Sequence, residues 1–178
     1  MNNKFYAVLV ILLWGFALQG AAQKNPDWEK WEWLIGDWIG EGSGKTGEGT
    51  GQFSIKKDLD GKVLIRKNHA VYPATRAKPK IVHDDLMIIY KDMSDNLPKA
   101  MYFDNEGHAI PYLVTYAEKA IVLTSKSVAN YPVFRLTYSL LEKGLINVKF
   151  EMSQDGGKFR TYTEGTCKKG KVRRKTRE

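Results

Sequence analysis

The sequence predicts an all-β fold, an antiparallel up-and-down barrel of about ten strands preceded by a short helix. Beyond Gly36 apolar and polar residues alternate, which is the period of half-buried strands. Gly, Pro, Asn and Asp interrupt this pattern every eight to twelve residues, as expected for many short strands joined by turns. Cys167 is the only cysteine, so packing and strand pairing must hold the fold without an intramolecular disulfide.

The chain begins with features of an export signal. Lys4 precedes an apolar run over residues 5–18, and the small residues Gly20, Ala21 and Ala22 follow it. This arrangement is typical of a signal peptide, here with cleavage before Gln23, and the run is short for a bilayer-spanning helix. We therefore expect residues 1–22 to be removed, residues 23–167 to form one domain, and the protein to be periplasmic or secreted. An uncleaved membrane anchor is the alternative.

The net charge of +8 is concentrated at the carboxyl terminus. Residues 168–178 contain seven Lys or Arg residues and one Glu, and Lys4 leaves with the signal peptide, so residues 23–167 carry only +1. The tail contains no aromatic residue for base stacking, so no nucleic-acid partner is expected. It is interpreted either as a solvated terminus or as a weak contact to an anionic surface.

The short helix is predicted from a capping pattern. Asn-Pro-Asp at 25–27 supplies an N-cap, a proline at the first helical position and an acidic residue near the positive end of the dipole. Trp28, Trp31 and Leu34 or Ile35 then form one apolar stripe. We expect this stripe to cover one end of the barrel.

Ten strands follow, separated by turns with defined chemistry. Asp60-Gly61, Gly107, Gly144 and Gly156-Gly157 supply glycine where tight hairpins need positive φ. The strands are expected near 37–44, 49–57, 62–72, 82–91, 98–104, 108–117, 120–126, 132–140, 145–152 and 158–166. Consecutive hairpins give an up-and-down order, and closure removes exposed edges. A barrel of ten strands is wide, so a cavity is expected inside it.

Two strands indicate how the faces are used. Ile146, Val148, Phe150 and Met152 alternate with Asn147, Lys149 and Glu151, which assigns one buried and one wet face. The strand at 82–91 is apolar on both faces near residues 86–89, which is expected where the helix or another strand covers its outside.

The stretch Gly-Asp-Trp-Ile-Gly-Glu-Gly at 36–42 resembles the opening of lipocalin-like (calycin) domains, in which the tryptophan of a Gly-x-Trp motif closes one end of the barrel. Its longer form is similar to that of nitrobindin-type ten-stranded barrels. Residues 59–64 and 102–108 resemble exported bacterial lipocalin-like domains. The resemblance implies a fold with a cavity and no particular reaction. Nitrobindins hold a ferric haem through a histidine on the closing strand, but residues 158–166 contain none and offer only Tyr162 as an oxygen ligand, so no cofactor is expected.

Polar residues on apolar strands are the candidate ligand-binding residues. Arg66 and Asn68 share one face of their strand and His69 occupies the other. A small-molecule site is mostly apolar with a few convergent polar groups. The full candidate set is Trp38, Arg66, Asn68, His69, Asp85, Tyr102, His108, Tyr112 and Arg135. Arg66 or Arg135 could instead stack over Trp38 and close the barrel end.

The three histidines keep catalysis open. His69, His83 and His108 lie near carboxylates, and His83 shares a strand face with Asp85 at positions i and i+2. Metal-ligand spacing is poor, so no metal site is assigned. Residues 40–47 only superficially resemble a phosphate-binding loop, because no strand–loop–helix unit surrounds them.

Three functions follow from these features. The first is an exported protein that binds a small apolar or amphipathic molecule in the barrel cavity. The second is an enzyme that uses a His/Asp acid–base pair or a metal site in the barrel. The third is a structural module with a filled lumen.

Overall fold

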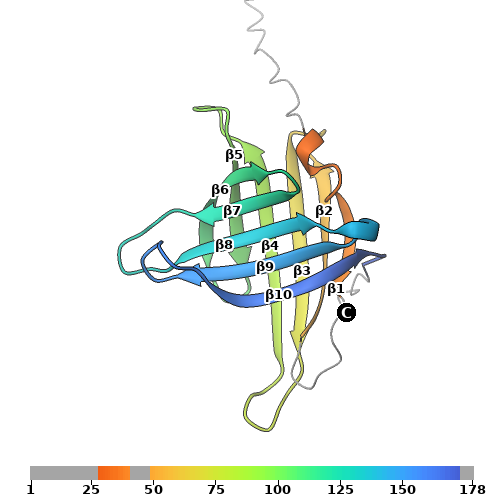
Figure 1. Cartoon of the computed structure of the whole chain (residues 1–178), viewed down its shortest axis with the longest axis vertical. Coiled ribbons are helices and arrows are strands. Elements are labelled where there is room, and N and C mark those ends of the chain that lie inside the picture. Colours follow the sequence, from red (N-terminus) through yellow and green to blue (C-terminus); the bar gives the residue numbers. More distant parts are fainter. Residues whose placement is uncertain (1–27, 41–48, 173–178) are drawn as a thin grey trace, which may run out of the picture.

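The computed structural model describes residues 28–40 and 49–172, which form a closed antiparallel barrel (Figure 1). Each strand pairs with its neighbours in sequence, and β1 closes the barrel by pairing with β10. The strands are β1 (Gly36–Gly40), β2 (Thr50–Asp58), β3 (Val63–Tyr72), β4 (Ile81–Lys91), β5 (Pro98–Asp104), β6 (Ala109–Ala117), β7 (Ala120–Ser125), β8 (Val133–Leu140), β9 (Ile146–Ser153) and β10 (Arg160–Lys169). The predicted all-β, ten-stranded, up-and-down order is confirmed.

The two ends of the barrel differ. At one end, residues 28–35 lie over the strand ends: Trp28 Nε1 donates to the carbonyl of Gly61, and Trp31 Nε1 donates to Tyr116 Oη. We call this the covered end. The opposite end carries the loops 73–80, 105–108, 126–132 and 154–159, and we call it the open end. The β3–β4 hairpin projects far beyond the rest of the barrel there (Figure 1).

The lumen next to the covered end is filled by large side chains. Strands β2, β3 and β4 run across the direction of β7 to β10, so the barrel is flattened into two crossing layers (Figure 1). Between them lie the fully buried Trp31, Trp38, Leu64 and Tyr138, with Phe53 stacked on Trp38 at 6.3 Å between ring centroids. Aromatic side chains thus occupy much of the width that ten strands provide.

The predicted N-terminal helix is reduced to one short turn. The described residues form a 3₁₀ helix, η1 (Glu29–Trp31), and the expected cap at 25–27 lies outside the described residues. Trp28, Trp31 and Leu34 are nevertheless buried, so the apolar stripe covers the barrel end without an α-helix.

The remaining boundaries agree with the sequence to within a few residues. Gly61, Gly107, Gly144 and Gly156 all have positive φ, as predicted for the hairpin turns. The first strand ends at Gly40, and residues 41–44 lie outside the described part of the chain. The last strand runs on to Lys169, so Lys168 and Lys169 pair with β1 instead of belonging to a separate tail.

The outside of β4 is apolar, as its sequence indicates. Leu86 and Ile88 point outward, beside Phe103 and Met101 of β5 on the same face. The neighbouring strands therefore supply the apolar contacts that the sequence attributed to a covering element. None of the helices among the described residues is long and apolar enough to cross a membrane.

Candidate functional site

Cross-strand pairing brings polar residues together on the inward face of the barrel, toward its open end. Asn68 of β3 lies opposite Asp85 of β4, which lies opposite Asp104 of β5. Directly opposed residues of antiparallel strands share a face, so these side chains project to the same side as the buried Arg66 and Met87. The polar cluster consists of Arg66, Asn68, His83, Asp85, Tyr102, Asp104 and His108.

A buried ion pair forms the floor of the polar cluster. The Arg66 Nη1 group donates to Asp85 Oδ1, and Asn68 Nδ2 donates to Asp85 Oδ2 at 2.9 Å. The Arg66 and Asp85 side chains are only 7% and 4% exposed. Burial has the largest effect and acts to lower the pKa of Arg66, but the charge and hydrogen bond of Asp85 together with the nearby Tyr138 and Tyr102 outweigh it, so the pKa lies above its usual value. The guanidinium also lies over the ring of Phe53, at 5.3 Å from the centroid.

Above this floor, His83 is held between carboxylates. Its Nε2 lies 3.5 Å from Asp85 Oδ2 and 3.0 Å from Tyr102 Oη, and its Nδ1 lies 3.1 Å from Glu106 Oε1. Asp85 first and Glu106 second raise the pKa of His83 to about 9, against the effect of burial. A protonated imidazole donates from both nitrogens, which fits the acceptors on both sides.

This pKa predicts a pH-dependent stability. The folded-state pKa of His83 lies above the ordinary value of about 6.5, so the stabilisation is complete below pH 6.5 and is lost as the pH rises through about 9. Urea denaturation of the wild type should therefore give a smaller free energy of unfolding at pH 9.5 than at pH 6.5. His83→Gln should remove most of this difference; an equal pH dependence in this variant would contradict the assignment.

The chain of hydrogen bonds continues to the β5–β6 turn. Tyr102 Oη donates to Asp104 Oδ2 at 3.2 Å, and His108 Nδ1 lies 2.8 Å from the same oxygen. Asp104 Oδ1 accepts from the backbone N–H groups of Glu106 and His108. Burial acts to raise the pKa of Asp104, but the hydrogen bonds from His108 and Glu106 outweigh it, and the pKa is lowered. The buried carboxylate thus orients a His108 side chain that is 58% exposed.

Two buried polar atoms at the bottom of the cluster have no hydrogen-bond partner among the described residues: Arg66 Nε and Tyr138 Oη. Tyr138 projects into the lumen from β8, with its ring 5.8 Å from that of Phe53. Burial raises the pKa of Tyr138 to about 12, although the charge of Arg66 acts to lower it. An unpaired buried polar group costs free energy, so both atoms are suited to a water molecule or to a polar atom of a ligand.

The two tyrosines of the lumen are expected to respond differently to loss of the hydroxyl. Tyr102→Phe removes bonds to His83 and Asp104 and should lower the free energy of unfolding by about 1–3 kcal/mol. Tyr138→Phe removes an unpaired hydroxyl and should be neutral or stabilising. Urea denaturation of both variants measures the difference. A large loss in Tyr138→Phe would contradict the unpaired state of this hydroxyl and would indicate a bond to Arg66, the nearest charged group.

Apolar side chains face the polar cluster across the open end. Phe134, Val148, Phe150 and Ile110 are half-buried and pack against the core. Phe134 stacks on Phe150 with centroids 5.8 Å apart, and Tyr162 meets the edge of Phe150 at 6.0 Å. The inward face of the open end is therefore polar on β3 to β5 and apolar on β6, β8 and β9.

Beside these apolar residues, β10 leaves room. Gly165 lies opposite Val148, and Thr163 lies opposite Phe150, so both are on the inward face. Both are exposed, and a Cβ atom added at Gly165 would meet no described atom within 4 Å. A register shift between Thr161 and Thr163 interrupts the alternation at Tyr162, which is 71% exposed although its ring contacts Phe150.

The remaining predicted site residues lie elsewhere. Trp38 and Tyr112 are buried in the core, with Trp38 Nε1 donating to the carbonyl of Leu34 at 2.8 Å. His69 projects outward, and its Nδ1 lies 2.6 Å from Asp84 Oδ1. Arg135 also projects outward, bonding Glu151 and lying over Phe159 at 3.9 Å.

The alternative of an arginine lid over Trp38 is wrong. Arg66 lies over Phe53, and the cation over the Trp38 ring is Lys169 of β10, with Nζ 5.4 Å from the centroid. Lys169 reaches this position because β10 extends beyond the expected strand end and pairs with Trp38. The sequence pattern predicts a tail over residues 168–178, so it does not indicate a contact between Lys169 and Trp38.

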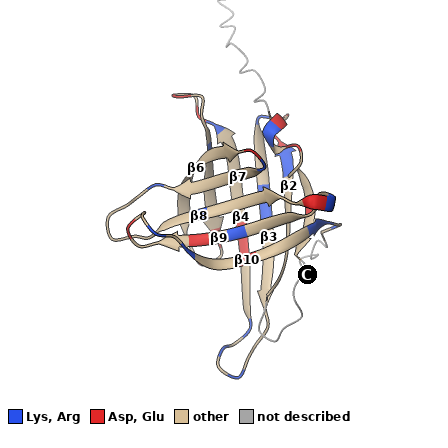
Figure 2. Cartoon of the chain, in the orientation of Figure 1, with Lys and Arg blue, Asp and Glu red and all other residues tan. Residues whose placement is uncertain are grey.

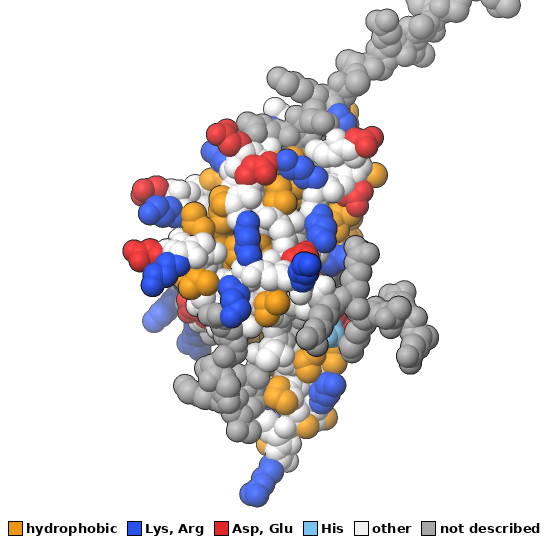
Figure 3. All heavy atoms as spheres, turned by 90° about the vertical axis from the view of Figure 1, so that its right-hand side faces the viewer, with side chains coloured by type: hydrophobic (Ala, Val, Ile, Leu, Met, Phe, Trp, Pro, Cys, Tyr) orange, Lys and Arg blue, Asp and Glu red, His pale blue; other side chains and the backbone are white. Residues whose placement is uncertain are grey.

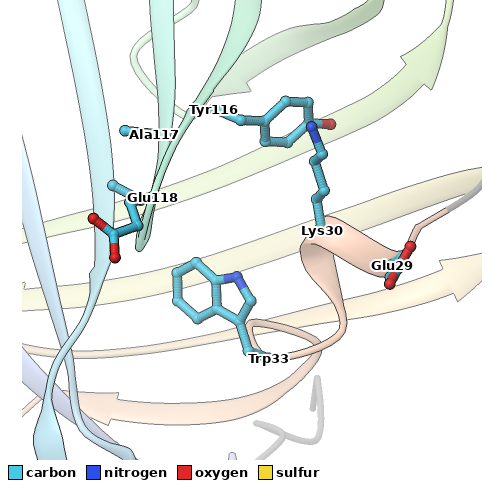
Figure 4. Close-up of a pocket in the computed structure, with 7 residues that line it drawn as sticks. Glu29, Lys30, Trp33, Tyr116, Ala117 and Glu118 are labelled. Carbon is cyan, nitrogen blue, oxygen red and sulfur yellow. The ribbon is translucent and has the colours of Figure 1, made fainter.

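A separate hollow lies outside the barrel at the covered end. It has a volume of about 450 Å³ and lies between η1 and the β6–β7 turn (Figure 4). Trp33 and Tyr116 form its apolar walls, Glu118 lies across from η1, and Lys30 Nζ is 4.6 Å above the Tyr116 ring. It shares no residue with the polar cluster. Lys30 already occupies one face of Tyr116.

Comparison with known proteins does not assign the barrel to a family. No protein-family model and no curated protein matches the chain. The closed ten-stranded barrel is compatible with the lipocalin-like resemblance. Within the described ranges, no group of three or more His, Cys, Asp or Glu side chains is placed to hold a metal ion.

Proposed function

We propose that the barrel binds a small amphipathic molecule at its open end, with the polar part of the molecule against the polar cluster and the apolar part against β8 and β9. The main support for this proposal is that the inward face is divided by polarity. His83 and Tyr102 lie on its polar side, Phe134 and Phe150 lie on its apolar side, and there is space beside Gly165. Small-molecule sites commonly combine apolar walls with a few oriented polar groups.

The ligand is placed at the open end and not deep in the lumen, because Trp38, Tyr112 and Tyr138 fill the barrel beyond Arg66. The polar groups within reach are those that are only half-buried, His83, Tyr102 and Asn68. The Arg66–Asp85 pair lies beneath them and holds Asn68 in place. We therefore assign Arg66 a positioning role.

We also propose that the chain is exported and that its barrel is of the nitrobindin type. Ten strands in up-and-down order and a buried tryptophan in β1 support this kinship. The absence of histidine from β10 argues against a haem held as in that family. The signal-like pattern at residues 1–22 supports export.

The ligand proposal is tested by filling the space beside β10. Gly165→Leu adds an apolar side chain where no described atom interferes, so it should block the site while leaving the midpoint of urea denaturation unchanged. Thr161→Leu, on the outer face of the same strand, is the matched control. Native mass spectrometry should find a retained molecule on wild type and Thr161→Leu, and displacement of an anilinonaphthalene sulfonate dye measures affinity.

Substitutions in the two halves of the site complete the test. Asn68→Ala and Phe150→Ala should each weaken dye binding about tenfold, because each removes a contact of roughly 1.5 kcal/mol. His69→Ala, the outward neighbour of Asn68, should not change it. Equal binding by the wild type, Gly165→Leu and Phe150→Ala would contradict binding at the open end.

The His108–Asp104 pair favours a second candidate, an acid–base enzyme in the same barrel. A buried carboxylate orients an exposed imidazole, as in a general base. Such an enzyme would consume the molecule that it binds, while His108→Ala would retain it unchanged. A simple binding protein would return the same molecule from both chains, so mass spectrometry of the released molecule distinguishes the two functions.

A further inference from the structure

The loops of the open end carry an excess of positive charge. Arg76, Lys78 and Lys80 lie on the projecting hairpin, and Lys126 and Lys158 lie on the two following long loops. Only Glu106 and Asp155 oppose them, so the described loops of this end have a net charge of +3. Figure 2 shows the ribbon of the projecting hairpin with blue Lys and Arg positions and no red Asp or Glu position.

The covered end has no loop of this kind. Residues 28–35 and the turns 59–62, 92–97, 118–119 and 141–145 together have a net charge of −3, but Lys99, Lys168, Lys169 and Lys171 lie at the same end. Asp92 and Asp95 both contact Lys99. Basic and acidic groups are therefore mixed at the covered end, whereas the projecting hairpin carries three basic residues and no acidic one.

Large apolar side chains are exposed among the positive charges. Val128 and Tyr131 at the tip of the β7–β8 loop are 55% and 68% exposed, and Ile81 at the base of the projecting hairpin is 45% exposed. Figure 3 shows hydrophobic and basic side chains together at the lower end of the molecule, where Figure 1 places this hairpin. The covered end also exposes apolar residues, such as Met93, but among acidic groups.

We propose that the open end of the barrel docks on the surface of an anionic phospholipid bilayer. Basic residues next to such a surface each favour binding, and aromatic and aliphatic side chains enter the interfacial region. The projecting hairpin decides which end docks, because both ends expose apolar side chains and, among the described loops, only this hairpin carries three basic residues with no acidic one. This surface is distinct from the proposed ligand site, and docking does not depend on that site being occupied.

The C-terminal basic segment offers a competing route to the same surface. Its described start, residues 170–172, follows Lys169, which pairs with Trp38 near the covered end. Docking through the loops and attraction through this segment would therefore orient the barrel in opposite directions. An experiment that reads orientation separates them.

The first measurement is co-sedimentation of the full chain with vesicles of phosphatidylcholine alone or with about 30% phosphatidylglycerol. The ratio of the protein's partition coefficients for the two kinds of vesicle measures the charge-dependent part of binding, because insertion of apolar segments contributes to both coefficients. Replacing Arg76, Lys78 and Lys80 by Gln should lower this ratio about 100-fold, since each charge contributes roughly fivefold. Replacing Lys30, Lys119 and Lys143 by Gln is the matched control at the covered end and should change it little.

The second measurement reads orientation. Val128→Cys and Met93→Cys place a single reactive thiol on exposed loops at opposite ends, while Cys167 is buried. A nitrobenzoxadiazole label at position 128 should shift to the blue and gain intensity with anionic vesicles, and one at position 93 should not. The proposal is overturned if the label at 93 responds instead, or if neutralising Arg173, Arg174, Lys175 and Arg177 abolishes the ratio while the hairpin variant retains it.

Discussion

Replacing Arg66 by methionine is expected to lower the free energy of unfolding by about 3–5 kcal/mol, the cost of leaving one member of a buried ion pair alone. Methionine fills similar space, so the loss reports the charge more than a cavity. Asp85 would keep only Asn68 as a hydrogen-bond donor in its buried position, with His83 3.5 Å away. Urea denaturation at pH 7 measures the effect, and Arg66→Ala should lose at least as much.

The double variant Arg66→Met/Asp85→Leu provides the control. Replacing both members of a buried pair by apolar groups is often nearly neutral, so the double variant should be more stable than Arg66→Met alone. Some loss should remain, because Asn68 loses its acceptor and His83 loses a neighbouring carboxylate. If the double variant is as unstable as the sum of the two single ones, the pair does not act as a unit.

The burial of Arg66 indicates a supporting role in place of the predicted contact with a ligand. The sequence shows that Arg66 and Asn68 share a face, and the structure places both on the inward face with Asp85. The sequence does not show that the guanidinium binds Asp85, because the strand that carries the carboxylate lies about twenty residues away and its register is set by the hairpin at 73–80. A residue predicted to meet a ligand is therefore one that supports its neighbours.

Alternation predicted the inner and outer faces well, with one instructive departure. Ile146, Val148 and Phe150 face inward as expected. Glu151 faces outward as expected, yet it is buried, because Arg135 and Lys149 pair with it. The hydrogen bond from Arg135 is the largest of the effects on the pKa of Glu151, and it lowers this pKa. A strand pattern reports which side a residue faces and cannot report what lies over that side.

His83 shows what the sequence could have indicated more strongly. Its spacing from Asp85 at i and i+2 places both on one strand face, but the ligand-binding residues predicted from the sequence do not include His83. Its contacts with Tyr102 and Glu106 depend on the pairing of β4 with β5, which no local spacing reveals. The unpaired Tyr138 hydroxyl is likewise a property of the whole barrel.

Replacing Trp38 by alanine is expected to lower the free energy of unfolding by about 3–5 kcal/mol, the usual loss for a large buried aromatic side chain. Trp38 is 1% exposed, stacks on Phe53, and ties β1 to residues 28–35 through its bond to the Leu34 carbonyl. Its loss should loosen the covered end, so amide hydrogen exchange should accelerate in β1 and around Leu34 first. Tyr162→Ala is the matched control: this aromatic residue is 71% exposed on β10, and its removal should cost no more than about 0.5 kcal/mol. If Trp38→Ala unfolds at the same urea concentration as Tyr162→Ala, the tryptophan of β1 does not hold the covered end, and residues 28–35 must be held there by the bonds of Trp28 and Trp31.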